Sequence, residues 1–128
     1  MTVTGTPTTI EAPVAQLAPV VEATEFNAPE LVAVASKKYE VDLNLALKIA
    51  RCESNLRQFN AKTGQVLRGR QNSADVGIFQ INERYHLKQS KDLGYDIYKA
   101  GDNVEYAMYL LDKDGSRHWK ASQKCWGK

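Results

Sequence analysis

Three prolines spaced six residues apart constrain this chain of 128 residues more than any other feature. Pro7, Pro13 and Pro19 deny the first part a continuous helix, because proline lacks an N–H and fixes φ. They favour an extended, polyproline-like chain. We therefore expect residues 1–27 to form a linker or tail, with an edge strand packed on the body as the alternative. Residues 28–128 are long enough for one domain.

The body carries an excess of positive charge. All 17 basic residues but only 12 of the 15 acidic ones lie from Ala28 onward, which gives a net charge of +5. This charge suits an anionic partner such as a cell-wall polymer, or it only keeps the domain soluble. The basic residues are scattered, with no run and no helical stripe, so we do not expect a nucleic-acid-binding function.

Neither a membrane span nor a secretory signal is expected from the hydropathy pattern. No apolar run approaches the ~20 residues that a spanning helix needs. The first basic residue is Lys37, so the basic start of a signal peptide is absent. Such a segment could have been removed from the chain, or the protein could leave its cell by another route.

Two cysteines, Cys52 and Cys125, leave two alternatives open. They are either buried free thiols or a disulfide, which would contribute about 4 kcal/mol in the chain-entropy model and imply an oxidising compartment. Only His86 and His118 could join them at a metal, and CxxC spacing is absent. We therefore expect no metal site and no cofactor.

Apolar residues at helical spacing predict a mainly helical domain with a minor β element. Proline in the first turn supports the first helix, and Gly115 ends the last one. The expected helices cover residues 28 to about 39, 43–54 and 103 to about 114. Their expected caps are Asn27, Asp42 and Asp102.

Glycines and polar residues break the helical period between residues 62 and 75. Val66 and Leu67 on one side, and the apolar residues of 76–81 on the other, predict a small irregular hairpin. We expect a short helical turn to begin at Asp92. The aromatic segment 119–126 is expected to pack back on the body, with Trp119 and Trp126 in packing roles.

Glu53 is the residue that most needs an explanation. It follows apolar positions near the end of the expected central helix, where burial would raise the pKa of its carboxyl and suit it to general acid catalysis. The alternative is a surface glutamate at a frayed helix end. A second polar set lies at 75–82, where Gly77 suits a close backbone approach and Gln80 and Asn82 can hydrogen-bond to hydroxyls and amides.

Taken together, these segments resemble a known superfamily. The letters CESN at 52–55 and DVGIFQIN at 75–82, with Tyr85 and His86 close behind, are similar to lysozyme-like domains, and most of all to bacterial lytic transglycosylase (SLT) domains. The stretch from Asn103 to Leu110 is similar to a helix of this family, and the W..S..CW ending is similar to that of some bacterial members. The resemblance covers about residues 29–126, and it implies a lysozyme-like fold with a hairpin beside the catalytic helix.

The resemblance implies cleavage of the β-1,4 bond between N-acetylmuramic acid and N-acetylglucosamine in peptidoglycan. Glu53 would be the general acid and base, and the products would be 1,6-anhydro-muramic ends. Asp75 departs from the small residue that many SLT domains carry there. It is either the second carboxylate of a lysozyme-type hydrolase or a hairpin residue. A non-catalytic glycan-binding or structural module is the alternative of another class.

The resemblance also implies further roles. Gln80 is expected to line the cleft, Ser54 to contact substrate or cap its helix, and Asn82 to contact substrate or fix the loop after the strand. Tyr106, rather than Tyr109, is expected near Glu53. Residues 64–73 form either a substrate lip or a solvated hairpin, and His86 and His118 have no expected catalytic role.

A Cys52–Cys125 bridge would hold the catalytic helix against the chain's last segment. We expect a monomer whose partner is peptidoglycan glycan strands. The expected location is extracytoplasmic: secreted, periplasmic, wall-associated or phage-associated.

Overall fold

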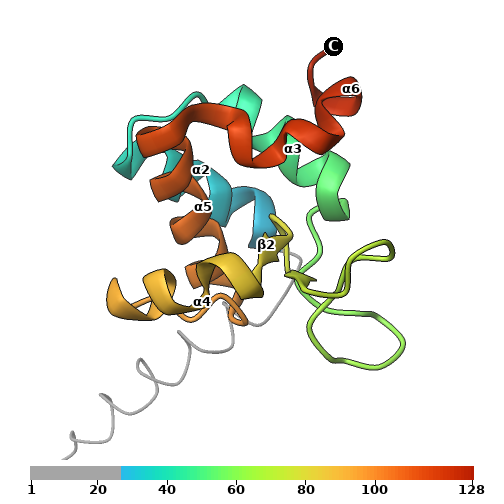
Figure 1. Cartoon of the computed structure of the whole chain (residues 1–128). Helices are drawn as coiled ribbons and strands as arrows, with labels where there is room; N and C mark the ends of the chain where they lie inside the picture. The colour runs from blue at the N-terminus through green and yellow to red at the C-terminus, as the bar shows by residue number, and fades with distance from the viewer. Residues whose placement is uncertain (1–26) are drawn as a thin grey trace, which may run out of the picture.

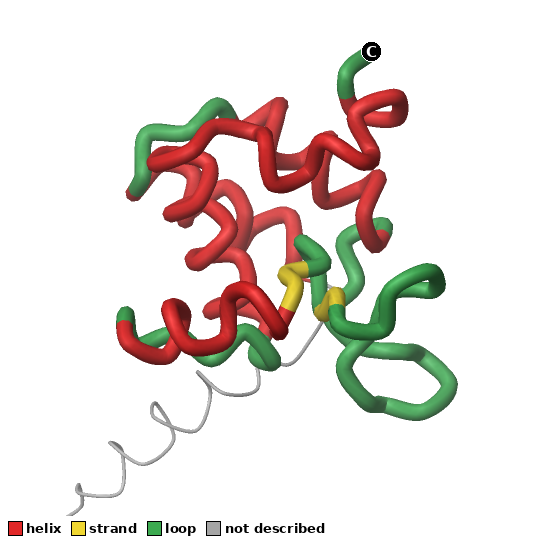
Figure 2. Tube along the Cα trace, in the orientation of Figure 1, coloured by secondary structure: helices red, strands yellow, loops and turns green. Residues whose placement is uncertain are grey.

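The computed structural model describes residues 27–128; the predictions for the tail at residues 1–26 lie outside these described residues. Between residues 27 and 128 the chain is mainly helical, with one small antiparallel sheet (Figures 1 and 2). The predicted fold class is therefore confirmed. No helix in this range is long and apolar enough to span a bilayer.

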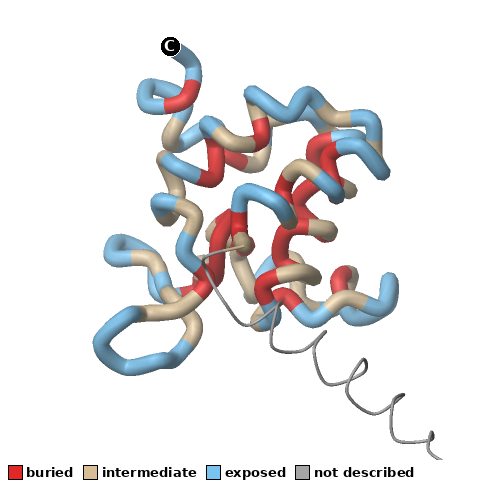
Figure 3. The backbone as a smooth tube through the Cα atoms, turned by 180° about the vertical axis from the view of Figure 1, so that it is seen from behind, coloured by how far each residue is buried: buried red, intermediate tan, exposed pale blue. Residues whose placement is uncertain are grey.

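Three helices form the helical frame. They are α2 (Ala28–Lys38), α3 (Leu43–Ser54) and α5 (Ala100–Asp114). Helix α2 packs against both α3 and α5, and Figure 3 shows the buried stretches of these helices facing one another. Ile49, Val104 and Leu110 are among the buried residues that stabilise this core. The predicted positions of α2 and α3 are confirmed, and that of α5 is confirmed except that the helix begins three residues earlier than predicted, at Ala100.

The predicted caps are confirmed only in part. Asp42 accepts a hydrogen bond from the Asn44 N–H and caps α3. Asn27 gives α2 no side-chain cap. The prediction for Asp102 is wrong, because α5 begins at Ala100, and the Asp102 carboxylate accepts from the Asp96 N–H instead.

One of the longer helices was not predicted. Helix α4 (Glu83–Asp92) begins after Asn82, whose side-chain oxygen accepts from the N–H groups of Arg84 and Tyr85. Only Ser90 of this helix is fully buried, so the apolar spacing that reveals a helix is weak here. The expected start of a helical turn at Asp92 is wrong: Asp92 ends α4.

The β element is shorter than predicted and differently paired. Strand β1 (Asp75–Val76) pairs antiparallel with β2 (Ile81–Asn82), so the hairpin lies within 75–82. Residues 66–68 contribute only isolated bridges, Phe59 with Val66 and Arg68 with Val76. Ile78 and Phe79 lie in the turn, where both are fully buried.

Two buried amides hold the hairpin turn. The Gln58 oxygen accepts from the Ile78 N–H, and the Asn103 oxygen accepts from the Phe79 N–H. A Cβ on Gly77 would lie 2.4 Å from Asn103 Nδ2 and 2.5 Å from Gln58 Oε1. Gly77 also has φ +79°, so glycine is required there both by space and by backbone conformation.

The last segment covers the end of α3. It comprises the 3₁₀ segment η3 (Gly115–Ser122) and α6 (Gln123–Trp126). Trp119 and Trp126 are 4% and 7% exposed, as their predicted packing role requires. A disulfide joins Cys52 to Cys125, with Cα atoms 6.0 Å apart, so the paired alternative is the one that forms.

Candidate active site

The centre of the site is the Glu53 carboxyl at the end of α3. It is half-buried, and this burial raises its pKa, with a smaller contribution from the charge of Asp75. Ser122 Oγ donates to Glu53 Oε2 at 2.5 Å, which opposes the shift without reversing it. The carboxyl therefore keeps its proton to a higher pH than an exposed glutamate does, which is the property a general acid needs.

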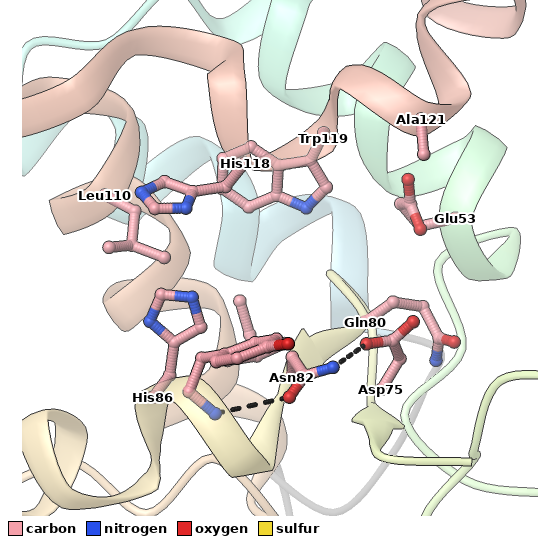
Figure 4. Close-up of a pocket in the computed structure, with 11 residues that line it drawn as sticks. Glu53, Asp75, Gln80, Asn82, His86, Leu110, His118, Trp119 and Ala121 are labelled. Carbon is pink, nitrogen blue, oxygen red and sulfur yellow. Dashed lines mark hydrogen bonds between the residues drawn. The ribbon is translucent and has the colours of Figure 1, made fainter. Parts of the chain in front are cut away.

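Glu53 lies where two cavities meet. The smaller cavity, about 240 Å³, extends from Glu53 toward α4 and η3, and Figure 4 shows the residues that line it. The larger cavity, about 780 Å³, extends toward the loop of residues 60–72. Four residues line both cavities: Glu53, Asp75, Gln80 and Ala121. The cavities are thus two parts of one cleft that passes Glu53.

Asp75 lies on the opposite side of the cleft from α3, at the start of the hairpin (Figure 4). Burial raises the pKa of its carboxyl, while the hydrogen bond from Asn82 Nδ2, 3.0 Å from Oδ1, opposes that shift. The side chain of Asn82 therefore does two things. It orients Asp75 and it caps α4, in keeping with the prediction that it fixes the chain after the strand.

Gln80 lines both cavities with its amide oriented by the hairpin. Its Nε2 donates to the Gly77 carbonyl at 2.9 Å, and the residue itself has φ +50°. This conformation is uncommon for a residue with a Cβ, and it turns the side chain into the cleft. The structure thus brings Glu53, Asp75, Gln80 and Asn82 together.

The structure gives Ser54 and Tyr106 other partners. Ser54 Oγ donates to the Ile78 carbonyl at 2.7 Å and accepts from the Arg57 N–H, so it ties the helix end to the hairpin. Tyr106 is fully buried, and its hydroxyl bonds to His86 Nδ1 at 2.9 Å. Neither residue lines the two cavities. The hydroxyl that contacts Glu53 comes from Ser122.

Sequence reasoning missed three residues of the smaller cavity, Tyr85, His86 and His118. Tyr85 is 81% exposed at its mouth, an unusual position for an aromatic ring without a ligand. The available signal was Asn82 followed by Glu83, a helix start that would have placed Tyr85 and His86 in the first turn after the hairpin.

Residues 64–73 contribute most to the larger cavity. Arg70 lines it and is exposed, and its side chain has no ion pair with any residue in the described range. Arg68 differs, because it bonds to Glu83 Oε2 and to the Ser73 carbonyl. Of the two alternatives for this segment, its position along the cleft supports the substrate lip.

The site is thus a half-buried acid at the end of α3 that faces a short hairpin across an open cleft. The family model of the transglycosylase SLT domain matches residues 30–121, which is most of the chain. The protein therefore belongs to the transglycosylase SLT family, whose members act on peptidoglycan. Searches of curated proteins and of solved structures found no significant match.

Proposed function

We propose that this domain breaks the β-1,4 bond between N-acetylmuramic acid and N-acetylglucosamine, with Glu53 as general acid and then base. The observation that carries the proposal is the position of Glu53, half-buried where the two cavities meet, with a raised pKa. Since a sugar alkoxide is a poor leaving group, a proton delivered to the glycosidic oxygen is the main requirement for cleavage.

The hydrogen bonds around Glu53 indicate which oxygen carries the proton. Ser122 Oγ donates to Oε2, and Trp126 Nε1 donates to Ser122 Oγ at 3.1 Å. The Ser122 hydroxyl also has the Trp119 carbonyl within reach at 3.2 Å, but Glu53 Oε2 is the nearer acceptor. With the Ser122 hydrogen on Oε2, the acidic proton is on Oε1, from which it would be delivered to the glycosidic oxygen.

The proposed reaction consumes no water. Glu53 protonates the glycosidic oxygen as the bond to C1 breaks, and the N-acetylglucosamine side leaves with a free hydroxyl. The substrate's own acetamido oxygen assists at C1. The Glu53 carboxylate then takes the proton of the muramic C6 hydroxyl, whose oxygen bonds to C1 and displaces the assisting acetamido oxygen. A 1,6-anhydro end forms and the acid is restored.

A second candidate is a lysozyme-type hydrolase that uses both carboxylates. The observation in its favour is that Asp75 lines the same two cavities and accepts a hydrogen bond from Asn82, which supports its ionised form. The raised pKa of Asp75 works against that form. In this reaction Asp75 would stabilise the sugar cation or bond to it, and water would complete the reaction.

Mass spectrometry of the products from purified walls separates the two reactions, because anhydro ends are one water lighter than reducing ends. Glu53→Gln should lower the rate by about 10²–10⁴ in either case. Asp75→Asn should leave a transglycosylase substantially active and disable the hydrolase. Full activity of Glu53→Gln would reject both, and glycan binding without turnover in the unaltered protein would support a binding module.

Loss of activity in Glu53→Gln should not reflect unfolding. Burial raises the pKa of Glu53 in the folded state, so the carboxylate form costs stability once the pH rises through that pKa. The neutral amide avoids this cost. Thermal unfolding of the variant near neutral pH should therefore occur at or above the temperature of the unaltered protein.

We further propose that the protein works outside the cytoplasm, secreted, periplasmic or wall-associated, with a phage-borne role also compatible. Peptidoglycan lies there, and the Cys52–Cys125 disulfide suits an oxidising compartment. Wall glycan strands are its proposed partner, and the domain is proposed to act as a monomer.

A further inference from the structure

The smaller cavity ends in two imidazoles that the proposed reaction does not use. His86 on α4 and His118 on η3 stand on the wall across the cavity from Glu53 and Asp75 (Figure 4). Their rings meet edge to face with centroids 5.1 Å apart, and no hydrogen bond joins them. Each ring has one nitrogen held by a residue of α5, and the other nitrogen has no partner between residues 27 and 128.

The partner of His118 fixes which of its nitrogens carries hydrogen. His118 Nε2 lies 2.8 Å from Asp114 Oδ2. This hydrogen bond, with the nearby Arg117 and Lys113, lowers the pKa of Asp114, so the carboxylate is ionised and can only accept. Nε2 therefore donates, and in the neutral ring Nδ1 is left as a hydrogen-bond acceptor.

The partner of His86 fixes the opposite arrangement. The Tyr106 hydroxyl is fully buried, and its one partner in the described range is His86 Nδ1. Burial raises the pKa of Tyr106 to about 12, so the hydroxyl keeps its hydrogen and must donate it to Nδ1. Burial lowers the pKa of His86, and a positive charge on His118 would lower it further, so the His86 ring is neutral and its Nε2 carries an N–H that is free to donate.

When the His118 ring is neutral, the wall thus offers one N–H donor, His86 Nε2, and one nitrogen acceptor, His118 Nδ1. We propose that His86 and His118 bind the acetamido group of an N-acetylated sugar in the smaller cavity. The acetamido carbonyl accepts from His86 Nε2, and the acetamido N–H donates to His118 Nδ1. This inference rests on the proposed function, and it assigns the two histidines as substrate-binding residues for that reaction.

The size and lining of the cavity fit such a group. Its volume of about 240 Å³ is below the roughly 300–1,000 Å³ of sites that enclose a drug-sized ligand, so it suits a single sugar residue. Leu110 and Ile81 line it as well, and they can pack against the acetamido methyl. Tyr85 at the mouth offers a ring face to the sugar.

The test measures binding without turnover. The full chain with Glu53→Gln is labelled with ¹⁵N and titrated with tetra-N-acetylchitotetraose, and the ring nitrogens of both histidines are followed by NMR. We expect the signals of His86 Nε2 and His118 Nδ1 to shift on binding. Shifts at the amides of Asp75 and Gln80 with unmoved imidazole signals, or no binding at all, would overturn the inference.

Variants in the same background separate hydrogen bonding from packing. His86→Phe and His118→Phe keep a ring but remove the polar contact, and each should weaken binding roughly 3- to 10-fold. His86→Gln places an amide N–H near the Nε2 position and His118→Asn an amide oxygen near the Nδ1 position, so both should recover most of the affinity. Equal affinity in the Phe variants, or no recovery, would contradict the proposal.

The failure of this inference is distinguishable from that of the proposed function. Cleavage of walls that persists in Glu53→Gln rejects the function whatever the histidines do. Loss of cleavage in Glu53→Gln, together with chitotetraose binding that leaves the signals of both imidazoles unchanged, rejects only the acetamido site.

Discussion

The two sides of the cleft are built in opposite ways. The helical side, α3 with η3 and α6, carries Glu53 and is fixed by a disulfide and by buried tryptophans. The loop side, residues 59–75, carries Asp75 and Arg70, and Figure 3 shows most of it as exposed. The disulfide and the indole contacts hold the acid in place on the helical side, while the loop residues that line the larger cavity are mostly exposed.

Removing the disulfide of the helical side is expected to lower stability more than any of the other changes. Cys52→Ser with Cys125→Ser should lower the free energy of unfolding by about 4 kcal/mol, because the unfolded chain gains the entropy that a bridge over 73 residues removes. Chemical denaturation measures this loss. The unaltered protein under reducing conditions is the control and should match the double variant. If both keep the original midpoint and activity, the bridge does not stabilise the helical side.

A substitution in the hairpin turn is expected to cause the next largest loss of stability. Gly77→Ala should lower the free energy of unfolding by about 3 kcal/mol, because a Cβ there overlaps the buried amides of Asn103 and Gln58. Gly64→Ala is the matched control. Gly64 also has a positive φ, +76°, but its Cβ would meet nothing within 4 Å, so only backbone strain of about 1 kcal/mol remains. Equal losses of stability in the two variants would mean that the overlap of the Gly77→Ala Cβ with the buried amides costs nothing.

Ser122 tests how the helical side controls the acid. Its hydrogen bond lowers the pKa of Glu53 against the effect of burial, so Ser122→Ala should raise that pKa further. The alkaline limb of the pH–rate profile should then move to higher pH, and kcat should fall roughly 5- to 10-fold as the carboxyl loses its orientation. Ser116→Ala, in the same segment, should change neither. If the alkaline limb of the profile stays at the same pH, Ser122 does not change the pKa of Glu53.

The smallest effect is expected on the loop side. Arg68→Ala removes the ion pair with Glu83, whose two side chains are 43% and 26% exposed, so solvent screening limits the stability loss to about 1 kcal/mol or less. The loop should become more mobile, and KM for wall glycan should rise more than kcat falls. Arg57→Ala, an exposed arginine outside the cleft, is the control. A fall in kcat alone would place Arg68 in the chemistry instead.

Sequence reasoning predicted the helices that have regular apolar spacing and the site residues that stand out beside such helices. Helices α2, α3 and α5 have apolar faces that are read directly from the sequence, and Glu53 stands out because it follows such a face. Helix α4 was missed because it buries only Ser90 fully and offers little apolar pattern. The hairpin was placed only in part, because the turn at 77–80 is held by Gln58 and Asn103, which are distant in sequence.

The site residues also divide into some that the sequence could predict and others that it could not. Asp75, Gln80 and Asn82 lie within one short segment, so their proximity follows from sequence distance alone. Ser122 reaches Glu53 across 69 residues, and only packing in three dimensions reveals that contact. Tyr106 was expected beside Glu53, yet its hydroxyl bonds to His86, a residue whose helix the sequence did not reveal.

The distance along the chain between Glu53 and Ser122 has a consequence for biosynthesis. A ribosome translates Glu53 69 residues before the hydroxyl that orients it, and Cys52 73 residues before its bonding partner. Every translation intermediate that ends between Glu53 and Ser122 therefore has the acid but not its hydrogen-bond donor. In a nascent chain the proposed active site is therefore complete only after nearly all of the domain has been translated.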